Sequence, residues 1–356
     1  MAVVKSSIDD LPLAVVKRLS CPDKEFFNSF IWIKNFTETI TKPMGVEACF
    51  FYEDDAELPV VLPVIFTVEH SLRTVKSLTN YYSPIYSVIG NRADADGQHI
   101  ADFFITLQKQ LPAWDVMELR PLAFEESDFL LRQLKIAGLF AVSFFCFGNW
   151  YLDVNGRSYQ EYFAGLSSQL KNTVSRKSKK FLQLDGARIE IITSEQGLAE
   201  GMAAYLHVYQ SSWKVEEAFP EFMPGLMKLA ASIDGLRLGV AYFGNKAIAA
   251  QVWIVADKTA YIFKLAYDEN YKQYSAGTIL TTKLMEYVLD VDKVEVVDYL
   301  CGDDAYKKDW MSNRRERWGI LLFNTFTVRG CIGYAKETLK FYMKRLLNIL
   351  GKVSAN

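Results

Sequence analysis

The predicted strands and helices of this chain follow the same order twice. In the second half, predicted strands at 236–243 and 247–255 flank Gly244-Asn245, a pair typical of a two-residue hairpin turn. A strand at 259–266, a helix at 277–289 and a strand at 294–300 follow. The first half shows the same succession roughly 180 residues earlier, and such an offset indicates a duplicated domain.

The first half contains the matching segments. They are predicted strands at 47–53, 60–68, 75–78 and 85–88, a helix at 99–110, a strand at 115–119 and a helix at 125–137. Between the halves lie three predicted helices, at 159–184, 199–213 and 221–232. Strands that alternate with helices in this way predict an α/β protein with mixed sheets covered by helices.

Charge and composition limit the partners of the chain. Its 40 Lys and Arg against 42 Asp and Glu give a net charge of -2, so the chain as a whole creates no field that attracts DNA or an anionic membrane. The five cysteines are scattered, no pair has the spacing of a metal knuckle, and there are three histidines. We therefore expect reduced thiols, no bound metal and a cytoplasmic protein.

No segment predicts a transmembrane helix or a signal peptide. The most apolar stretch, 137–146, is ten residues long, whereas a membrane-spanning helix needs ~20 residues. Near the C-terminus, a helix predicted at 332–350 has apolar residues along one side and lysines elsewhere. We expect this helix to pack on its own domain; the alternative is that it lies on a membrane surface.

The segment 259–310 carries the clearest functional signal. Ser275, Ala276 and Gly277 are small and stand where the helix predicted at 277–289 begins. The first N–H groups of a helix have no partner inside the helix, so small residues there allow a phosphate to approach the main chain. Thr278 adds a hydroxyl donor or a helix cap. The alternative is an ordinary capped helix start with no ligand.

A set of motifs in this segment resembles a known family. The motifs are Tyr267-Asp268, the run Tyr274-Ser275-Ala276-Gly277-Thr278, Asp298, Gly302-Asp303, Tyr306-Lys307 and Trp310. Further upstream, Ser211-Ser212-Trp213 belongs with them. They resemble the GNAT superfamily of acyl-CoA-dependent N-acyltransferases. More narrowly, they resemble its BioF2-like branch of cellulose-biosynthesis-associated (CelD-like) acetyltransferases. That branch is related to the Fem-type peptidyltransferases, which carry two GNAT-like halves. The resemblance is good over 151–324 and loose over the first 145 residues.

The resemblance implies two fused GNAT-like domains with mixed central sheets flanked by helices. Residues 1–145 would form a degenerate domain, 146–330 the acyltransferase domain and 331–356 a terminal amphipathic helix. The loop of the first half that matches the small-residue loop contains Asp94 and Asp96. Two carboxylates at a helix start repel a diphosphate, so we expect the first half to bind no coenzyme A.

The resemblance also implies a donor site for acetyl-CoA or another acyl-CoA. The strands at 259–266 and 294–300 would part, and the pantetheine arm would bond to main-chain groups in the gap. The predicted binding residues are Leu265, Ala266, Tyr267, Lys272, Ser275, Ala276, Gly277 and Thr278. Gly277 matches the diphosphate loop of the superfamily. Two positions depart from that loop. Lys272 stands where Arg or Gln is usual, and Ser275 stands where Gly is usual.

The predicted catalytic groups lie within and just after the strand at 294–300. Asp298, Asp303 or Asp304 would act as the base, directly or through water. Tyr306 would protonate the departing thiolate, and Lys307 would hold an anionic part of the acceptor or the thioester oxygen. Each has a structural alternative. Aspartates followed by lysines also form a solvated helix start, and a carboxylate inside an apolar strand needs a partner that can be purely structural.

The predicted activity is acyl transfer from an acyl-CoA to an amine or hydroxyl of an acceptor. The acceptor would be a small molecule or a sugar nucleotide, and the branch points to polysaccharide or cell-envelope metabolism. Two alternatives keep the fold. In one, the donor is aminoacyl-tRNA, held by the basic residues between Lys171 and Lys180. In the other, the chain is a non-catalytic binding module.

Overall fold

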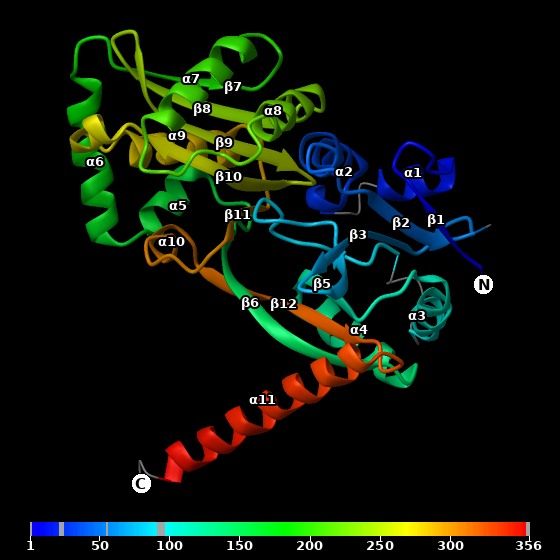
Figure 1. The fold of residues 1–356 in the computed structure, drawn as a ribbon. Helices are drawn as coiled ribbons and strands as arrows, with labels where there is room; N and C mark the ends of the chain where they lie inside the picture. The colour runs from blue at the N-terminus through cyan, green and yellow to red at the C-terminus, as the bar shows by residue number, and fades with distance from the viewer. Residues whose placement is uncertain (1, 21–24, 55, 91–96, 354–356) are drawn as a thin grey trace. The chain divides into compact units, whose positions relative to one another are not determined.

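The computed structural model describes residues 2–20, 25–54, 56–90 and 97–353 (Figure 1). The chain forms two compact units, one of Met1–Phe147 with Glu316–Asn356 and one of Gly148–Arg315. Strand β6 (Phe140–Asp153) carries the chain into the second unit, and β12 (Asn313–Phe323) carries it back. The first boundary lies two residues after the predicted one. The second lies at 315 rather than 330, because β12 pairs with β5 of the first unit from Arg317 onward.

The second unit is built on a mixed sheet. Its strands are β7 (Arg188–Ile192), β8 (Leu236–Phe243), β9 (Lys246–Ala256), β10 (Thr259–Tyr267), β11 (Val296–Cys301) and the end of β6, in that order. β10 and β11 are parallel, and the other neighbours are antiparallel. The parallel pair is joined by α9 (Ala276–Asp290), as a crossover between parallel strands requires.

Helices cover both faces of this sheet. A Cβ on Gly239 would touch Leu280 and Leu284 of α9, whereas the side chain of Leu238 reaches Gly201 of α7 (Leu198–Gln210). Neighbouring residues of a strand point to opposite faces, so α9 and α7 lie on opposite sides. The other helices of this unit are α5 (Tyr159–Gly165), α6 (Ser168–Leu182), α8 (Phe222–Ser232) and the short α10 (Lys307–Trp310).

The first unit repeats the strand order of the second. Its sheet runs β1 (Val3–Ser6), β2 (Ala48–Glu53), β3 (Val61–Glu69), β4 (Leu72–Ser77), β5 (Val116–Ala123) and the end of β12. β4 and β5 are its parallel pair. They are joined by α3 (Gln98–Gln110), and α4 (Phe124–Ile136) follows β5; the unit also contains α1 (Leu13–Leu19), α2 (Phe30–Phe36) and α11 (Val328–Val353). The predicted α/β class with mixed, helix-covered sheets is confirmed.

Local departures from the prediction have local causes. The helix expected at 159–184 is two helices, since Leu166 is extended and the Ser167 hydroxyl accepts a hydrogen bond from Leu170 N–H as the cap of α6. The segment 85–88 is not a strand; Ile89 beside it forms a single bridge to Val61. Residues 91–96, which contain the predicted acidic loop with Asp94 and Asp96, lie outside the described residues.

Candidate active site

A cavity of about 400 Å³ opens in the second unit. That size is within the range of ordinary small-molecule sites, ~300–1,000 Å³. Its walls are Trp213, Gln251, Leu265, Ala266, Tyr267, Tyr271, Lys272, Ser275, Ala276, Gly277, Thr278, Thr281, Tyr299, Tyr306 and Trp310. All eight residues predicted to bind the donor lie in this wall.

The cavity lies where two parallel strands part. β10 and β11 pair over Thr259–Tyr261 and Val296–Asp298, and both strands continue beyond that ladder. Leu265, Ala266 and Tyr267 of β10 and Tyr299 of β11 then line the cavity. Each strand is also irregular against its other neighbour, between Ile262 and Lys264 in β10 and between Asp298 and Cys301 in β11. Such irregularities bend a strand and interrupt its ladder.

The first turn of α9 forms one end of the cavity. Ser275 precedes it with a left-handed φ of 54° and makes no side-chain cap hydrogen bond. In such a turn the N–H groups of Ala276, Gly277 and Thr278 have no partner inside the helix. A Cβ added to Gly277 would meet only the Tyr267 ring, at 3.6 Å. The turn therefore offers main-chain donors and the positive end of a helix dipole to an anion in open space.

Gln251 of β9, which is not among the predicted site residues, fixes that turn. Its side chain is buried, and Nε2 donates to the Gly277 carbonyl at 2.9 Å and to the Thr281 hydroxyl at 2.8 Å. Its Oε1 accepts a hydrogen bond of 2.9 Å from Trp253 Nε1. The signal in the sequence is one amide inside the apolar strand Lys246–Ala256, since a buried amide must find partners.

Cations lie at the same end of the cavity. Lys272, in the 3₁₀ turn Glu269–Tyr274, lines the cavity with an exposed side chain and is 3.8 Å from Glu269. Lys177 of α6 donates a hydrogen bond of 3.2 Å to the carbonyl of Gln273 in that turn. Both ammonium groups add positive charge near the first turn of α9.

Aromatic rings form the rest of the wall. Trp213, in the loop after α7, stacks at an angle on Tyr267 with 4.5 Å between ring centroids. Tyr306 and Tyr299 meet edge to face at 5.7 Å. Burial, with Asp304 nearby, raises the pKa of Tyr306 to about 12, so its hydroxyl keeps its proton at neutral pH. Tyr306 is the one predicted catalytic residue that lines the cavity.

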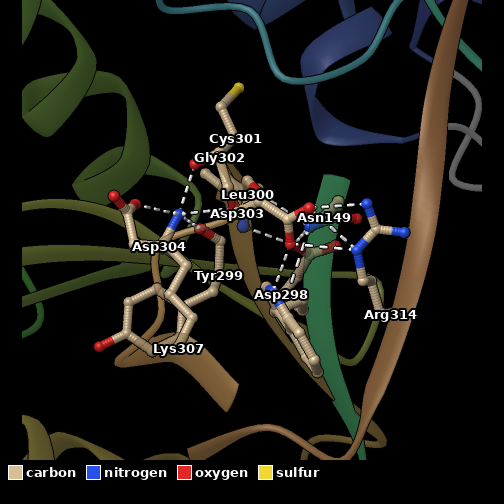
Figure 2. A network of polar contacts seen from close by, with 11 residues as sticks. Asn149, Asp298, Tyr299, Leu300, Cys301, Gly302, Asp303, Asp304, Lys307 and Arg314 are labelled. Carbon is tan, nitrogen blue, oxygen red and sulfur yellow. Dashed lines mark hydrogen bonds and ion pairs between the residues drawn. The ribbon is translucent and has the colours of Figure 1, made fainter. Parts of the chain in front are cut away.

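Asp298 lies away from the cavity. It is almost completely buried, and it precedes Tyr299, which faces the cavity. Its Oδ1 accepts hydrogen bonds from Leu300 N–H at 2.7 Å and from Asn149 Nδ2 at 2.6 Å (Figure 2), and the Arg315 guanidinium pairs with Oδ2. A carboxylate held by three partners inside the sheet matches the structural alternative and not the role of a base.

Asp303 is also occupied by structural partners. Arg314 donates two hydrogen bonds to its Oδ2, from Nε at 3.0 Å and from a terminal nitrogen at 2.6 Å, and Trp150 Nε1 donates to Oδ1 at 2.7 Å. The hydrogen bonds from Arg314 lower the pKa of the carboxyl, which makes Asp303 a weaker base. Figure 2 shows the Arg314 guanidinium bonded to the Asp303 carboxylate beside the strand that carries Asn149.

Lys307 holds the end of β11. Its ammonium donates to the carbonyl oxygens of Tyr299 and Gly302, both at 3.3 Å, and to that of Cys301, and it lies 3.4 Å from Asp304 (Figure 2). The side chain is buried and lies outside the cavity wall. Asp298, Asp303 and Lys307 thus fix the strand end from which Tyr299 and Tyr306 reach the cavity.

The described residues contain no group of three or more His, Cys, Asp or Glu side chains placed to hold a metal ion. In the same part of the chain, none of the helices combines the length and the apolar character that crossing a membrane requires.

A family model supports the identity of this region. Residues 168–308 match the model described as an acetyltransferase (GNAT) domain. The match spans α6 to α10, including the parted strands and the first turn of α9. No curated protein matches the chain significantly in sequence.

Solved structures share the fold over most of the chain. FemX is similar with a TM-score of 0.59 at 10% identity, over 90% of this chain and 97% of its own. A conserved protein of unknown function from Bacteroides thetaiotaomicron gives 0.55 at 10% identity, over 88% and 98%. The C-terminal domain of a protein named as a lysylphosphatidylglycerol synthetase from Agrobacterium fabrum gives 0.53 at 10% identity, over 90% and 95%.

At such identity these similarities concern the fold alone, whereas the family model concerns the sequence of one domain. The matched residues, 168–308, lie inside the unit that holds the cavity, Gly148–Arg315. We conclude that the chain carries a domain with the GNAT acetyltransferase fold, and that this domain lies within Gly148–Arg315.

Proposed function

We propose that the protein is an acyltransferase that moves an acyl group from an acyl-CoA to an amine, or a hydroxyl, of an acceptor. One observation carries the proposal: a cavity between parted parallel strands ends on the uncapped first turn of a helix. The gap offers main-chain groups to an extended pantetheine arm, and the turn offers N–H donors to its diphosphate.

The position of each predicted binding residue in the cavity wall suggests its role. The N–H groups of Ala276, Gly277 and Thr278 would hold the diphosphate, and Lys272 would balance its charge. The left-handed backbone at Ser275 leads the chain into the turn. The main chain of Leu265, Ala266 and Tyr267 would pair with the amides of pantetheine, as a further strand would.

The chemistry needs few side chains. The acceptor nitrogen attacks the thioester carbon, the C–N bond forms, the C–S bond breaks, and the sulfur leaves as a thiolate. Tyr306 protonates that thiolate, because its phenol is neutral and lines the cavity. The described wall contains no Asp, Glu or His, so we assign the removal of the acceptor proton to water.

The finer assignment follows the sequence resemblance. We place the chain in the BioF2-like (CelD-like) branch, with a small molecule or a sugar nucleotide as acceptor, in the cytoplasm and in polysaccharide or cell-envelope metabolism. Ser211-Ser212-Trp213 belongs to the motifs that carry this resemblance. Support for it from the structure is the position of Trp213 in the cavity wall.

Aminoacyl-tRNA is the second candidate donor. The observation that favours it is the row of cations on α6, among them Lys177, which contacts the turn beside the cavity. Basic rows bind nucleic acid through phosphates. The two donors differ in size and in salt dependence, so binding measurements separate them.

The test is calorimetric titration of the protein with acetyl-CoA. Gly277→Glu places a carboxylate where the diphosphate would lie. Gly165→Glu is the matched control, since a Cβ at Gly165 meets nothing within 4 Å and one at Gly277 meets only the Tyr267 ring, at 3.6 Å. We expect the first variant to weaken binding about tenfold or more, through charge repulsion in a partly buried site, and the control to bind like the wild type. Equal affinity in both variants would remove the assignment of the turn. A wild type that binds aminoacyl-tRNA and no acyl-CoA would favour the second donor.

A further inference from the structure

The C-terminal helix α11 (Val328–Val353) presents an apolar stripe to solvent. Val328, Ile332, Leu339 and Met343 are 77%, 62%, 61% and 55% exposed. Their spacings of four, seven and four residues place them on one side of an α-helix. We call these four positions the α11 stripe.

Another side of α11 packs on its own unit. The Tyr334 ring contacts Phe140 at 5.0 Å and Phe323 at 5.7 Å between centroids. The expectation that this helix packs on its own domain thus holds for one side only. Apolar side chains exposed in a continuous row, beside a side that is already packed, mark an interaction surface rather than scattered surface residues.

A row of basic residues runs beside the α11 stripe. Arg329, Lys336 and Lys340 are exposed and follow spacings of seven and four. Over its whole length α11 contains six Lys and Arg and one acidic residue, Glu337. Glu337 pairs with Lys340. The chain as a whole has a net charge of -2, so this positive charge is local to the helix.

We propose that α11 binds the surface of an anionic membrane, with the α11 stripe in the boundary between headgroups and acyl chains and the basic row on the lipid phosphates. Helices of this design lie in the plane of the interface. Local charge is sufficient, because screening confines the attraction to about 8 Å from the surface at physiological salt. This surface role is independent of the reaction in the cavity.

Charge argues against a second copy of the chain as the partner. Pairing two α11 stripes would bring two basic rows together, and coiled-coil seams instead place opposite charges at their flanks. Glu337 is the one acidic residue of the helix and is already paired. An anionic lipid surface supplies the missing negative charge along the whole row.

The test uses the full chain and sedimentation with vesicles of phosphatidylcholine, with or without about a third phosphatidylglycerol. We expect binding to the anionic vesicles and binding about tenfold weaker to the neutral ones. Ile332→Gln with Leu339→Gln should abolish binding to both, and Lys336→Glu with Lys340→Glu should abolish the preference for anionic vesicles. Leu58→Gln, at a leucine 63% exposed elsewhere in the chain, is the control and should bind like the wild type.

Several results would overturn the proposal. One is a wild type that stays in the supernatant with anionic vesicles. Another is equal sedimentation of the stripe variant when its thermal melt matches the wild type. A third is a dimer in light scattering without lipid that Leu339→Gln converts to a monomer, since a second copy would then cover the α11 stripe.

Discussion

Of the charged residues predicted for catalysis, none faces the cavity; the charged side chain in its wall is that of Lys272. The sequence predicted Asp298, Asp303 and Lys307 as catalytic, yet all three bond to residues that hold the end of β11. Local pattern could not show this, because Leu300 adopts a left-handed φ of 56° and the alternation of faces fails there. The small residues from Ser275 to Gly277 were predictable, since helix starts and small side chains are local features.

Tyr306 is the residue on which the proposed chemistry depends. We expect Tyr306→Phe to lower turnover by about 100-fold, the lower end of general acid contributions, with little change in donor affinity. The measurement is release of the free thiol from acyl-CoA with an amine acceptor that supports turnover. Tyr271→Phe, in the same wall, is the control. Equal turnover in Tyr306→Phe and the control would remove Tyr306 from the reaction.

The lowered pKa of Lys214 makes the stability of the fold depend on pH. Burial, and then the charge of Lys264, lower its pKa from 10.5 to about 8, and the Tyr209 and Trp213 rings flank it at 5.7 and 5.8 Å. The unfolded chain keeps this proton up to a higher pH than the folded chain. The charged lysine therefore lowers the free energy of unfolding in full below pH 8, and this destabilisation disappears as the pH rises from 8 to 10.5.

Lys214→Met should therefore raise the free energy of unfolding at pH 7, by about 2 kcal/mol. The gain should shrink toward pH 10 as the wild type loses its proton. Urea unfolding at both pH values measures it. A gain of the same size at both, or a loss at pH 7, would show that the lysine is not held in an unfavourable site.

At the scale of elements, hairpins and crossover helices were predictable and the strands that close each sheet were not. β8, β9, β10 and α9 lie within a few residues of their predicted bounds. β12 begins with the polar run Asn-Arg-Arg-Glu-Arg, which lacks the apolar pattern that predicts a strand. Its Arg315 bonds to Asn149, 166 residues away, and no local pattern contains a partner so distant.

Gln251 joins two of the predictable elements. Gln251→Leu keeps the volume but leaves the Gly277 carbonyl and Trp253 N–H without their partners. We expect a loss of about 1–3 kcal/mol in unfolding free energy, and weaker acetyl-CoA binding because the first turn of α9 is no longer fixed. Gln169→Leu, at an exposed position of α6, is the control. Denaturant melts and calorimetry measure the two effects, and unchanged binding would separate Gln251 from the site.

At the scale of the whole molecule, both units have the same strand order, and the cavity wall lies entirely within Gly148–Arg315. The repeated order of predicted strands and helices in the sequence agrees with this shared strand order. The exact boundaries were not predictable, because they fall inside β6 and β12, and a continuous strand gives no linker signal.

This division predicts that residues 148–315 fold alone. The fragment contains the core of α9 and the sheet as well as every residue of the cavity wall. We expect a cooperative thermal transition by circular dichroism, and acetyl-CoA affinity within about tenfold of the full chain. A fragment that shows no transition would mean that this unit depends on the rest of the chain for its stability.

The central claim is that the first turn of α9 and the gap between β10 and β11 hold an acyl-CoA. A crystal structure of the protein with coenzyme A tests it most directly. We expect diphosphate oxygens at about 3 Å from the backbone nitrogens of Gly277 and Thr278, with the pantetheine arm along Leu265–Tyr267. Coenzyme A bound elsewhere, with this turn in contact with solvent only, would contradict it.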